Sequence, residues 1–108
     1  MLTSFAILFL MLPAVDLATV DDCFDVENCC WKDKEPGCRG DIYHEDKSET
    51  RTGIPCQSWD RDSPHEHRFH NYGTSNACRN PDNTAAPWCY TTSENKRWDL
   101  CFEVCGDR

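Results

Sequence analysis

Nine of the 108 residues are cysteines, and this density constrains the fold more than any other feature of the sequence. Cysteine usage at this level in a short chain is typical of a secreted scaffold that disulfides hold together. Cysteine and aromatic residues supply much of the 39% hydrophobic content, and aliphatic residues are few beyond the N-terminus. Because so small an apolar core does not offset the entropy of the chain, disulfides must help, each adding about 2–4 kcal/mol. The sequence therefore predicts one small, loop-rich, disulfide-rich domain.

The first residues of the chain also favour secretion. An apolar run from Phe5 to Leu12 is too short to span a bilayer but suits the hydrophobic region of a signal peptide. Small residues follow at Ala14 and Ala18, so we expect a signal peptide over residues 1–18, with cleavage after one of these two. Since no second apolar stretch follows, we expect a secreted, extracellular protein without a membrane span.

The rest of the chain divides into three parts. They are an acidic, cysteine-containing extension over residues 19–37, a main domain over residues 38–105 and a short tail over residues 106–108. Aromatic residues and threonine cluster from Trp88 to Thr92 and from Arg97 to Phe102, which favours strands, and residues 94–96 suit the turn between them. Elsewhere Gly, Pro, Asn, Asp and Ser recur too often for long elements. We expect mostly loops, a few short antiparallel strands and little helix.

Rare residue types recur in a characteristic order over the main domain. The stretches that carry this order are Gly53-Ile54-Pro55-Cys56-Gln57-Ser58-Trp59, Pro64-His65-Glu66-His67, Cys78-Arg79-Asn80-Pro81-Asp82, Pro87-Trp88-Cys89-Tyr90 and Arg97-Trp98. Together they strongly resemble a kringle domain that spans residues 38–105. The resemblance implies a kringle-like fold and a non-enzymatic module that recognises other proteins.

The resemblance also implies a disulfide pattern, which the cysteine count alone leaves open. It pairs Cys38 with Cys105, Cys56 with Cys89 and Cys78 with Cys101, with Trp59, Trp88 and Trp98 packed around the sulfurs. Cys30 is the alternative first cysteine of the pattern, with Cys38 carried on an insertion. Cys38 is favoured because Gly40 to Tyr43 matches the Gly-x-x-Tyr spacing of the family.

Three cysteines, Cys23, Cys29 and Cys30, remain outside that pattern. Adjacent cysteines seldom bond to each other, because the ring that they close distorts the peptide. The simplest expectation is a disulfide from Cys23 to Cys29 or Cys30. The odd total then leaves one thiol over, for which a disulfide-linked homodimer is favoured over a buried thiol.

The best-known use of a kringle is a trough that binds lysine side chains, and the resemblance assigns residues to its parts. Asp82 matches one of the two carboxylates that hold the ammonium, Trp88, Tyr90 and Trp98 match the aromatic walls, and Arg97, with Arg68, matches the cationic end. Thr84 occupies the position of the second carboxylate, and one exposed carboxylate gains little from an ammonium in water. We therefore expect at most weak lysine binding, in a trough that serves protein recognition. The alternative is that Trp88 and Trp98 only cover the disulfide core.

One minority hypothesis and the alternative function concern the region around Cys38. Arg39-Gly40-Asp41 directly follows this cysteine and is similar to integrin-binding loops, although such tripeptides also arise by chance. A related alternative is a toxin- or defence-like effector that uses the kringle as a scaffold. Its activity would lie on the cysteine cluster from Cys23 to Cys38.

Other chemistry finds little support in the residues. His65, His67 and His70 suggest a metal cluster, but Pro-His-x-His belongs to the kringle pattern, so no metal or other cofactor is expected. The sequence has no nucleophile elbow, phosphate-binding glycine loop or cysteine-protease signature, and we expect no enzymatic activity. A formal charge of −8 would repel nucleic acid. The expected partner is an extracellular protein with a basic or lysine-bearing surface.

Overall fold

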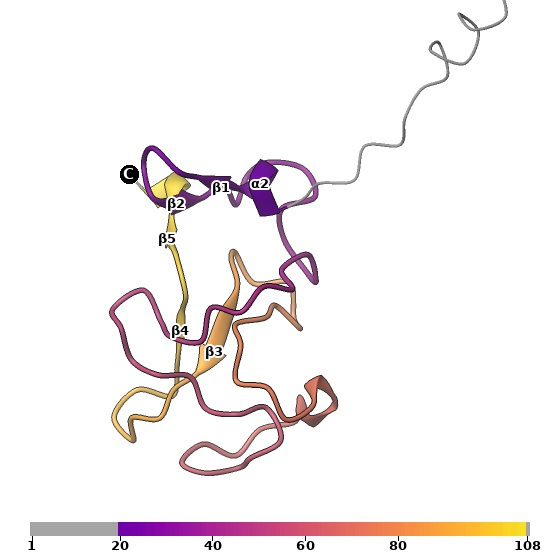
Figure 1. Cartoon of the computed structure of the whole chain (residues 1–108), viewed down its shortest axis with the longest axis vertical. Helices are drawn as coiled ribbons and strands as arrows, with labels where there is room; N and C mark the ends of the chain where they lie inside the picture. Colours follow the sequence, from indigo (N-terminus) through magenta and orange to yellow (C-terminus); the bar gives the residue numbers. More distant parts are fainter. Residues whose placement is uncertain (1–19, 108) are drawn as a thin grey trace, which may run out of the picture.

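Short elements separated by long loops make up the computed structural model, in which residues 20–107 are described (Figure 1). The helices are α2 (Val20–Cys23), η1 (His70–Tyr72) and η2 (Cys105–Asp107), and the strands are β1 (Phe24–Asp25), β2 (Cys30–Trp31), β3 (Trp88–Tyr90), β4 (Trp98–Leu100) and β5 (Glu103–Val104). No helix among these residues is long and apolar enough to cross a bilayer. The prediction of mostly loops, short strands and little helix is confirmed. The predicted signal peptide lies outside the described residues.

The predicted hairpin is present in the main domain. Strands β3 and β4 pair antiparallel, with Tyr90 directly opposite Trp98. Beyond the strands, the Thr91 N–H donates to the Arg97 carbonyl at 3.0 Å, which continues the pairing toward the turn. Aromatic residues occupy three of the six strand positions, and such residues fit a pleated, half-buried surface. The pairing brings Tyr90 and Trp98 side by side on one face of the hairpin.

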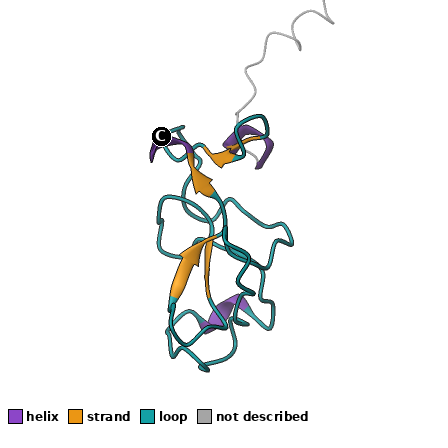
Figure 2. Ribbon diagram, turned by 90° about the vertical axis from the view of Figure 1, so that its left-hand side faces the viewer, coloured by secondary structure: helices purple, strands orange, loops and turns teal. Residues whose placement is uncertain are grey.

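A second small sheet joins the two ends of the described chain. Its strand order is β1-β2-β5, with β1 and β2 antiparallel and β2 and β5 parallel. Figures 1 and 2 show this sheet at one end of the molecule, with η1 toward the other end. Since β5 follows β4 closely, the sheet attaches the N-terminal segment to the main domain.

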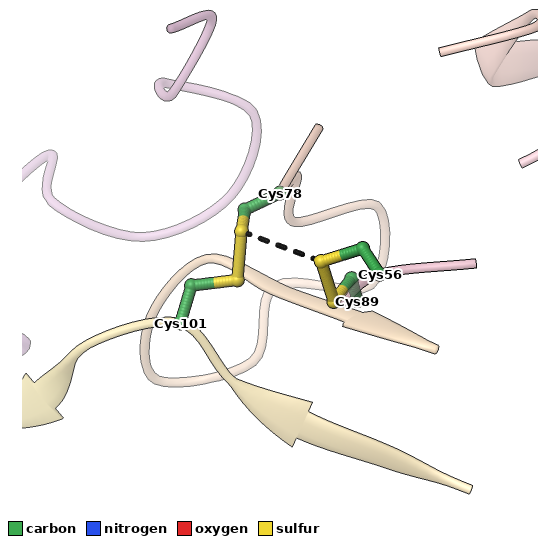
Figure 3. Close-up of side chains that lie close together, drawn as sticks. All are labelled: Cys56, Cys78, Cys89 and Cys101. Carbon is green, nitrogen blue, oxygen red and sulfur yellow. Dashed lines mark hydrogen bonds between the residues drawn. A yellow bond between two sulfur atoms is a disulfide. The ribbon is translucent and has the colours of Figure 1, made fainter. Parts of the chain in front are cut away.

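Two disulfides cross the centre of the main domain. Cys56 is bonded to Cys89, and Cys78 is bonded to Cys101, the pairs that the kringle resemblance implies. The Cys56 and Cys78 sulfurs lie 3.8 Å apart, so the two bonds are in contact (Figure 3). Because all four cysteines are buried, the bonds form the covalent interior of the domain.

The third disulfide that the resemblance implies, between Cys38 and Cys105, does not form, so this prediction is wrong. The structure bonds Cys30, not Cys38, to Cys105, so the alternative first cysteine is the one used. Cys38 is bonded to Cys23, which also contradicts the expected bond from Cys23 to Cys29 or Cys30. The physical reason is the parallel pairing of β2 with β5, which brings Cys30 opposite Glu103, close to Cys105 in the chain.

Cys29 is the only free cysteine among residues 20–107, and its side chain is exposed. Its backbone has a φ of 52°, in the left-handed region, while the next residue, Cys30, continues into β2 and is buried. Neighbouring cysteines therefore have opposite environments. The disulfide-linked homodimer through this thiol stays a prediction.

Tryptophan packing explains how the disulfides are shielded. Trp59 is buried against Trp88 and Tyr90, with ring centroids 5.4 and 5.8 Å away, and its indole N–H donates to the Ala77 carbonyl at 2.7 Å. Trp98 does not join this core, because 45% of it is exposed. The expectation that Trp98 packs around the sulfurs is thus wrong, and its indole lies at the surface beside Trp88.

A second aromatic cluster fixes the N-terminal segment. Trp31 is fully buried, and its ring stacks on Phe102 and meets the edge of Tyr43. The Trp31 indole N–H donates to the Cys38 carbonyl at 2.6 Å, next to the Cys23–Cys38 disulfide. The segment predicted as an extension is therefore packed against the main domain.

Candidate functional site

A tight loop between Arg79 and Trp88 positions the candidate carboxylate. Its ends are joined by two backbone hydrogen bonds, from Arg79 N to Trp88 O at 3.0 Å and from Trp88 N to Arg79 O at 2.8 Å. Inside the loop, the buried Asn80 side chain donates to the Thr84 carbonyl and accepts from the Thr84 N–H. This amide holds the turn in place of regular structure. Asp82 consequently lies on the exposed part of a fixed turn.

The carboxylate of Asp82 is oriented by two donors. Its Oδ1 atom accepts hydrogen bonds from the Trp88 indole N–H at 3.0 Å and from the Thr84 hydroxyl at 2.7 Å. Among residues 20–107, no hydrogen bond reaches the other oxygen, Oδ2. Thr84 stands where the kringle resemblance places a second carboxylate, and its hydroxyl donates its hydrogen bond to Asp82. The sequence did not reveal this role.

Three aromatic rings form the walls beside this carboxylate. The ring of Trp88 meets Tyr90 at 4.9 Å and 78°, and Trp98 at 5.7 Å and 66°. A cavity of about 190 Å³ lies between them, lined by Asp82, Thr84, Trp88, Tyr90, Arg97 and Trp98. We call this cavity the aromatic trough. The structure therefore brings together five of the six trough candidates, with Thr84 beside them.

Arg97 lines the trough beside Tyr90. Its guanidinium carbon is 5.0 Å from the centroid of the Tyr90 ring, and its Nη2 atom donates to the Glu66 carbonyl at 2.8 Å. Burial raises the pKa of Tyr90, and the Arg97 charge opposes that shift. The phenol therefore remains neutral at physiological pH, and the trough carries one carboxylate and one guanidinium.

Arg68 lies outside the aromatic trough. Its guanidinium stacks over Phe69 at 5.8 Å. It lines an adjoining cavity of about 530 Å³, together with Glu66, His67, Phe69, Asp82, Tyr90 and Arg97. Any part of Arg68 in binding is thus limited to the neighbouring surface.

His67 packs against Tyr90, one of the aromatic walls of the trough. Its ring stacks on Tyr90 with centroids 4.6 Å apart and planes 23° apart, and burial lowers its pKa. The Phe69 N–H donates to His67 Nδ1 at 3.0 Å, so the proton of the neutral ring is on Nε2. Asp62 and His70 lie close by, and one potential ligand atom of each of the three residues is within 4.8 Å of the others. The stacking makes His67 a structural support of Tyr90, and the absence of a metal at the histidines stays a prediction.

None of the residues of the Arg39-Gly40-Asp41 tripeptide lines the aromatic trough, although Gly40 lies close to Asn83 in the loop that carries Asp82. Arg39 and Asp41 are exposed on either side of Gly40, whose φ is +71°. A left-handed backbone here favours glycine. The geometry therefore gives Gly40 a structural reason that is independent of integrin binding.

Comparisons with known proteins agree with this architecture. The model of the kringle domain family matches residues 36–105. Plasminogen of Capra hircus is 42% identical over 87 residues, covering 70% of this chain and 71% of that sequence. The apolipoprotein(a)-like protein 2 of Homo sapiens is 46% identical over 68 residues, covering 57% of this chain and 52% of that sequence. The chain thus spans about half the length of the second relative. With more than half of its residues matched by the family model, the chain belongs to the kringle domain family.

Proposed function

We propose that this kringle is a secreted, non-enzymatic module that binds a lysine side chain of an extracellular partner protein in the aromatic trough. One observation carries the proposal. A carboxylate, three aromatic rings and a guanidinium line a single cavity, in the arrangement that a lysine and a neighbouring anionic group require. The kringle family is a family of protein-binding modules, which supports recognition rather than catalysis.

The proposed binding mode follows from the carboxylate oxygen without a hydrogen bond and from the exposed ring surface in the trough. The lysine ammonium would donate to Asp82 Oδ2, and its methylenes would lie against Trp98 and the edge of Trp88. Arg97 would face an anionic group of the partner. Since Asp82 is exposed, the ion pair contributes only about 0.2–1 kcal/mol. Binding of one lysine is therefore weak, and the rest of the affinity comes from the surrounding surface.

Secretion is part of the proposal. Four disulfides hold the described residues together, and such crosslinks form and persist in oxidising compartments. The formal charge of −8 favours basic partners over nucleic acid.

Retention on immobilised lysine tests the trough directly. Asp82→Asn and Trp98→Ala are each expected to weaken retention while leaving the disulfides intact, because one removes the anion and the other an exposed aromatic wall. Asp46→Asn, which removes a charge from an exposed residue outside the trough, is the matched control and should be retained like the parent chain. Unchanged retention of both trough variants would show that lysine binds elsewhere.

A further inference from the structure

The hydrogen-bonding capacity of the trough is poor for an unmodified lysine. A primary ammonium has three N–H donors, and each is hydrogen-bonded in water. At the anionic end of the trough, Asp82 Oδ1 already accepts from Trp88 and Thr84, which leaves Oδ2 as the free carboxylate oxygen. A bound ammonium would therefore exchange several hydrogen bonds to water for one strong partner. Unpaired polar hydrogens reduce affinity because their desolvation is uncompensated.

The aromatic part of the trough attracts a positive charge without needing N–H donors on the ligand. Trp88 stands at 66° to Trp98 and at 78° to Tyr90, so rings of different orientation border one cavity. Arg97 covers the Tyr90 ring and is held there by the Glu66 carbonyl. Since Trp88 is buried and turns its indole N–H toward Asp82, the exposed ring of Trp98 is the one left for a ligand cation. Ring faces attract a cation through their quadrupole and need no N–H donors.

These two properties point to a methylated cation. We propose that the trough prefers Nε-methylated lysine, and above all trimethyllysine, to unmodified lysine. Methylation removes the N–H donors that the trough does not satisfy, and it keeps the positive charge that Asp82 and the exposed Trp98 ring attract. The preference rests on the proposed function, since it concerns the same side chain in the same trough.

Titration with blocked amino acids measures this preference. The probes are Nα-acetyl-lysine methylamide and its Nε-trimethyl form, followed by the chemical shifts of the indole N–H groups of Trp88 and Trp98. We expect the trimethyl probe to bind about two- to fivefold more tightly. Equal or weaker binding would overturn the preference while leaving the proposed function standing, because unmodified lysine would still bind in the trough. Absence of binding by either probe would overturn both.

Two further probes identify which chemistry is used. An uncharged analogue with a tert-butyl group in place of trimethylammonium should bind more weakly, and equal affinity would overturn the assignment to cation recognition. Phosphocholine carries the same trimethylammonium group on a lipid headgroup. Tighter binding of phosphocholine than of the trimethyllysine probe would assign the trough to a headgroup and overturn the assignment to lysine.

Thr84→Asp provides the sharpest test. A second carboxylate would supply acceptors for N–H donors, so the variant is expected to reverse the preference in favour of unmodified lysine. Thr74→Asp adds the same charge at an exposed threonine outside the trough and should keep the preference of the parent chain. A Thr84→Asp variant that still favours trimethyllysine would overturn the argument from unsatisfied donors.

Discussion

Replacing Cys30 and Cys105 together by serine should destabilise the protein strongly, because it removes the disulfide that ties the N-terminal segment to the C-terminal end. The two residues are 75 apart in sequence, but Cys56–Cys89 already shortens the path between them. The shortest covalent path runs from Cys30 to Cys56, across to Cys89 and on to Cys105. It contains about 42 residues, for which loop closure corresponds to roughly 4 kcal/mol.

Guanidinium chloride unfolding, followed by tryptophan fluorescence, measures this loss. A decrease of roughly 4 kcal/mol is a large part of the 5–15 kcal/mol that holds a small domain folded, and it should lower the unfolding midpoint by roughly 1 M. Trp31, in the aromatic cluster beside Cys30, is a local probe of the same event. The two central disulfides remain in the variant, so the main domain is expected to stay folded.

Cys29→Ser is the matched control. It changes the neighbouring residue in the same way, but Cys29 is exposed and forms no disulfide, so its variant should unfold like the parent chain. The reasoning fails if the double serine variant keeps the parent midpoint. It also fails if Cys29→Ser is as unstable as that variant, because the free and bonded cysteines would then be exchanged.

Two further predictions concern the supports of the trough. Trp59→Phe should lower the free energy of unfolding by about 1–3 kcal/mol, because it leaves the buried Ala77 carbonyl without its donor; an unchanged denaturation midpoint would contradict this. Burial, and then the neighbouring His70 charge, holds the pKa of His67 below its usual value, so the unfolded chain takes up this proton first and stability should fall as the pH drops below about 6.5. His67→Gln should flatten the dependence of the unfolding midpoint on pH between about 6.5 and 5, whereas His44→Gln, at an exposed site, should preserve it; a parent-like slope in His67→Gln would refute this assignment.

Local sequence signals were sufficient for the hairpin of the main domain. The aromatic residues of Trp88–Tyr90 and Trp98–Leu100 are separated by a short polar turn, and these strands pair in the predicted antiparallel sense. Cross-strand pairing then places Trp98 next to Tyr90 without further information. The trough walls were accessible to prediction because they depend on one short hairpin and the loop before it.

The partner of Cys105 depended on contacts that no local pattern records. The Gly-x-x-Tyr spacing from Gly40 to Tyr43 places Cys38 near the start of the main domain, and that spacing is unaffected by which cysteine closes the domain. The choice of Cys30 follows from the parallel pairing of β2 with β5, which joins residues far apart in the chain. Pairing of this kind is set by the folded topology and not by the neighbours of each cysteine in sequence.

The chemistry of the trough depended on the direction of one hydroxyl group. Sequence comparison with the kringle pattern identifies Thr84 as a missing carboxylate, which predicts a weaker site of the same kind. In the structure the Thr84 hydroxyl donates to Asp82 Oδ1, so it also reduces the accepting capacity of the carboxylate that remains. An ammonium finds fewer acceptors at this carboxylate, whereas a methylated cation loses little, because the exposed ring of Trp98 attracts it without hydrogen bonds. If the trough binds cations as proposed, threonine at position 84 is therefore expected to change which cation is favoured as well as how strongly it binds.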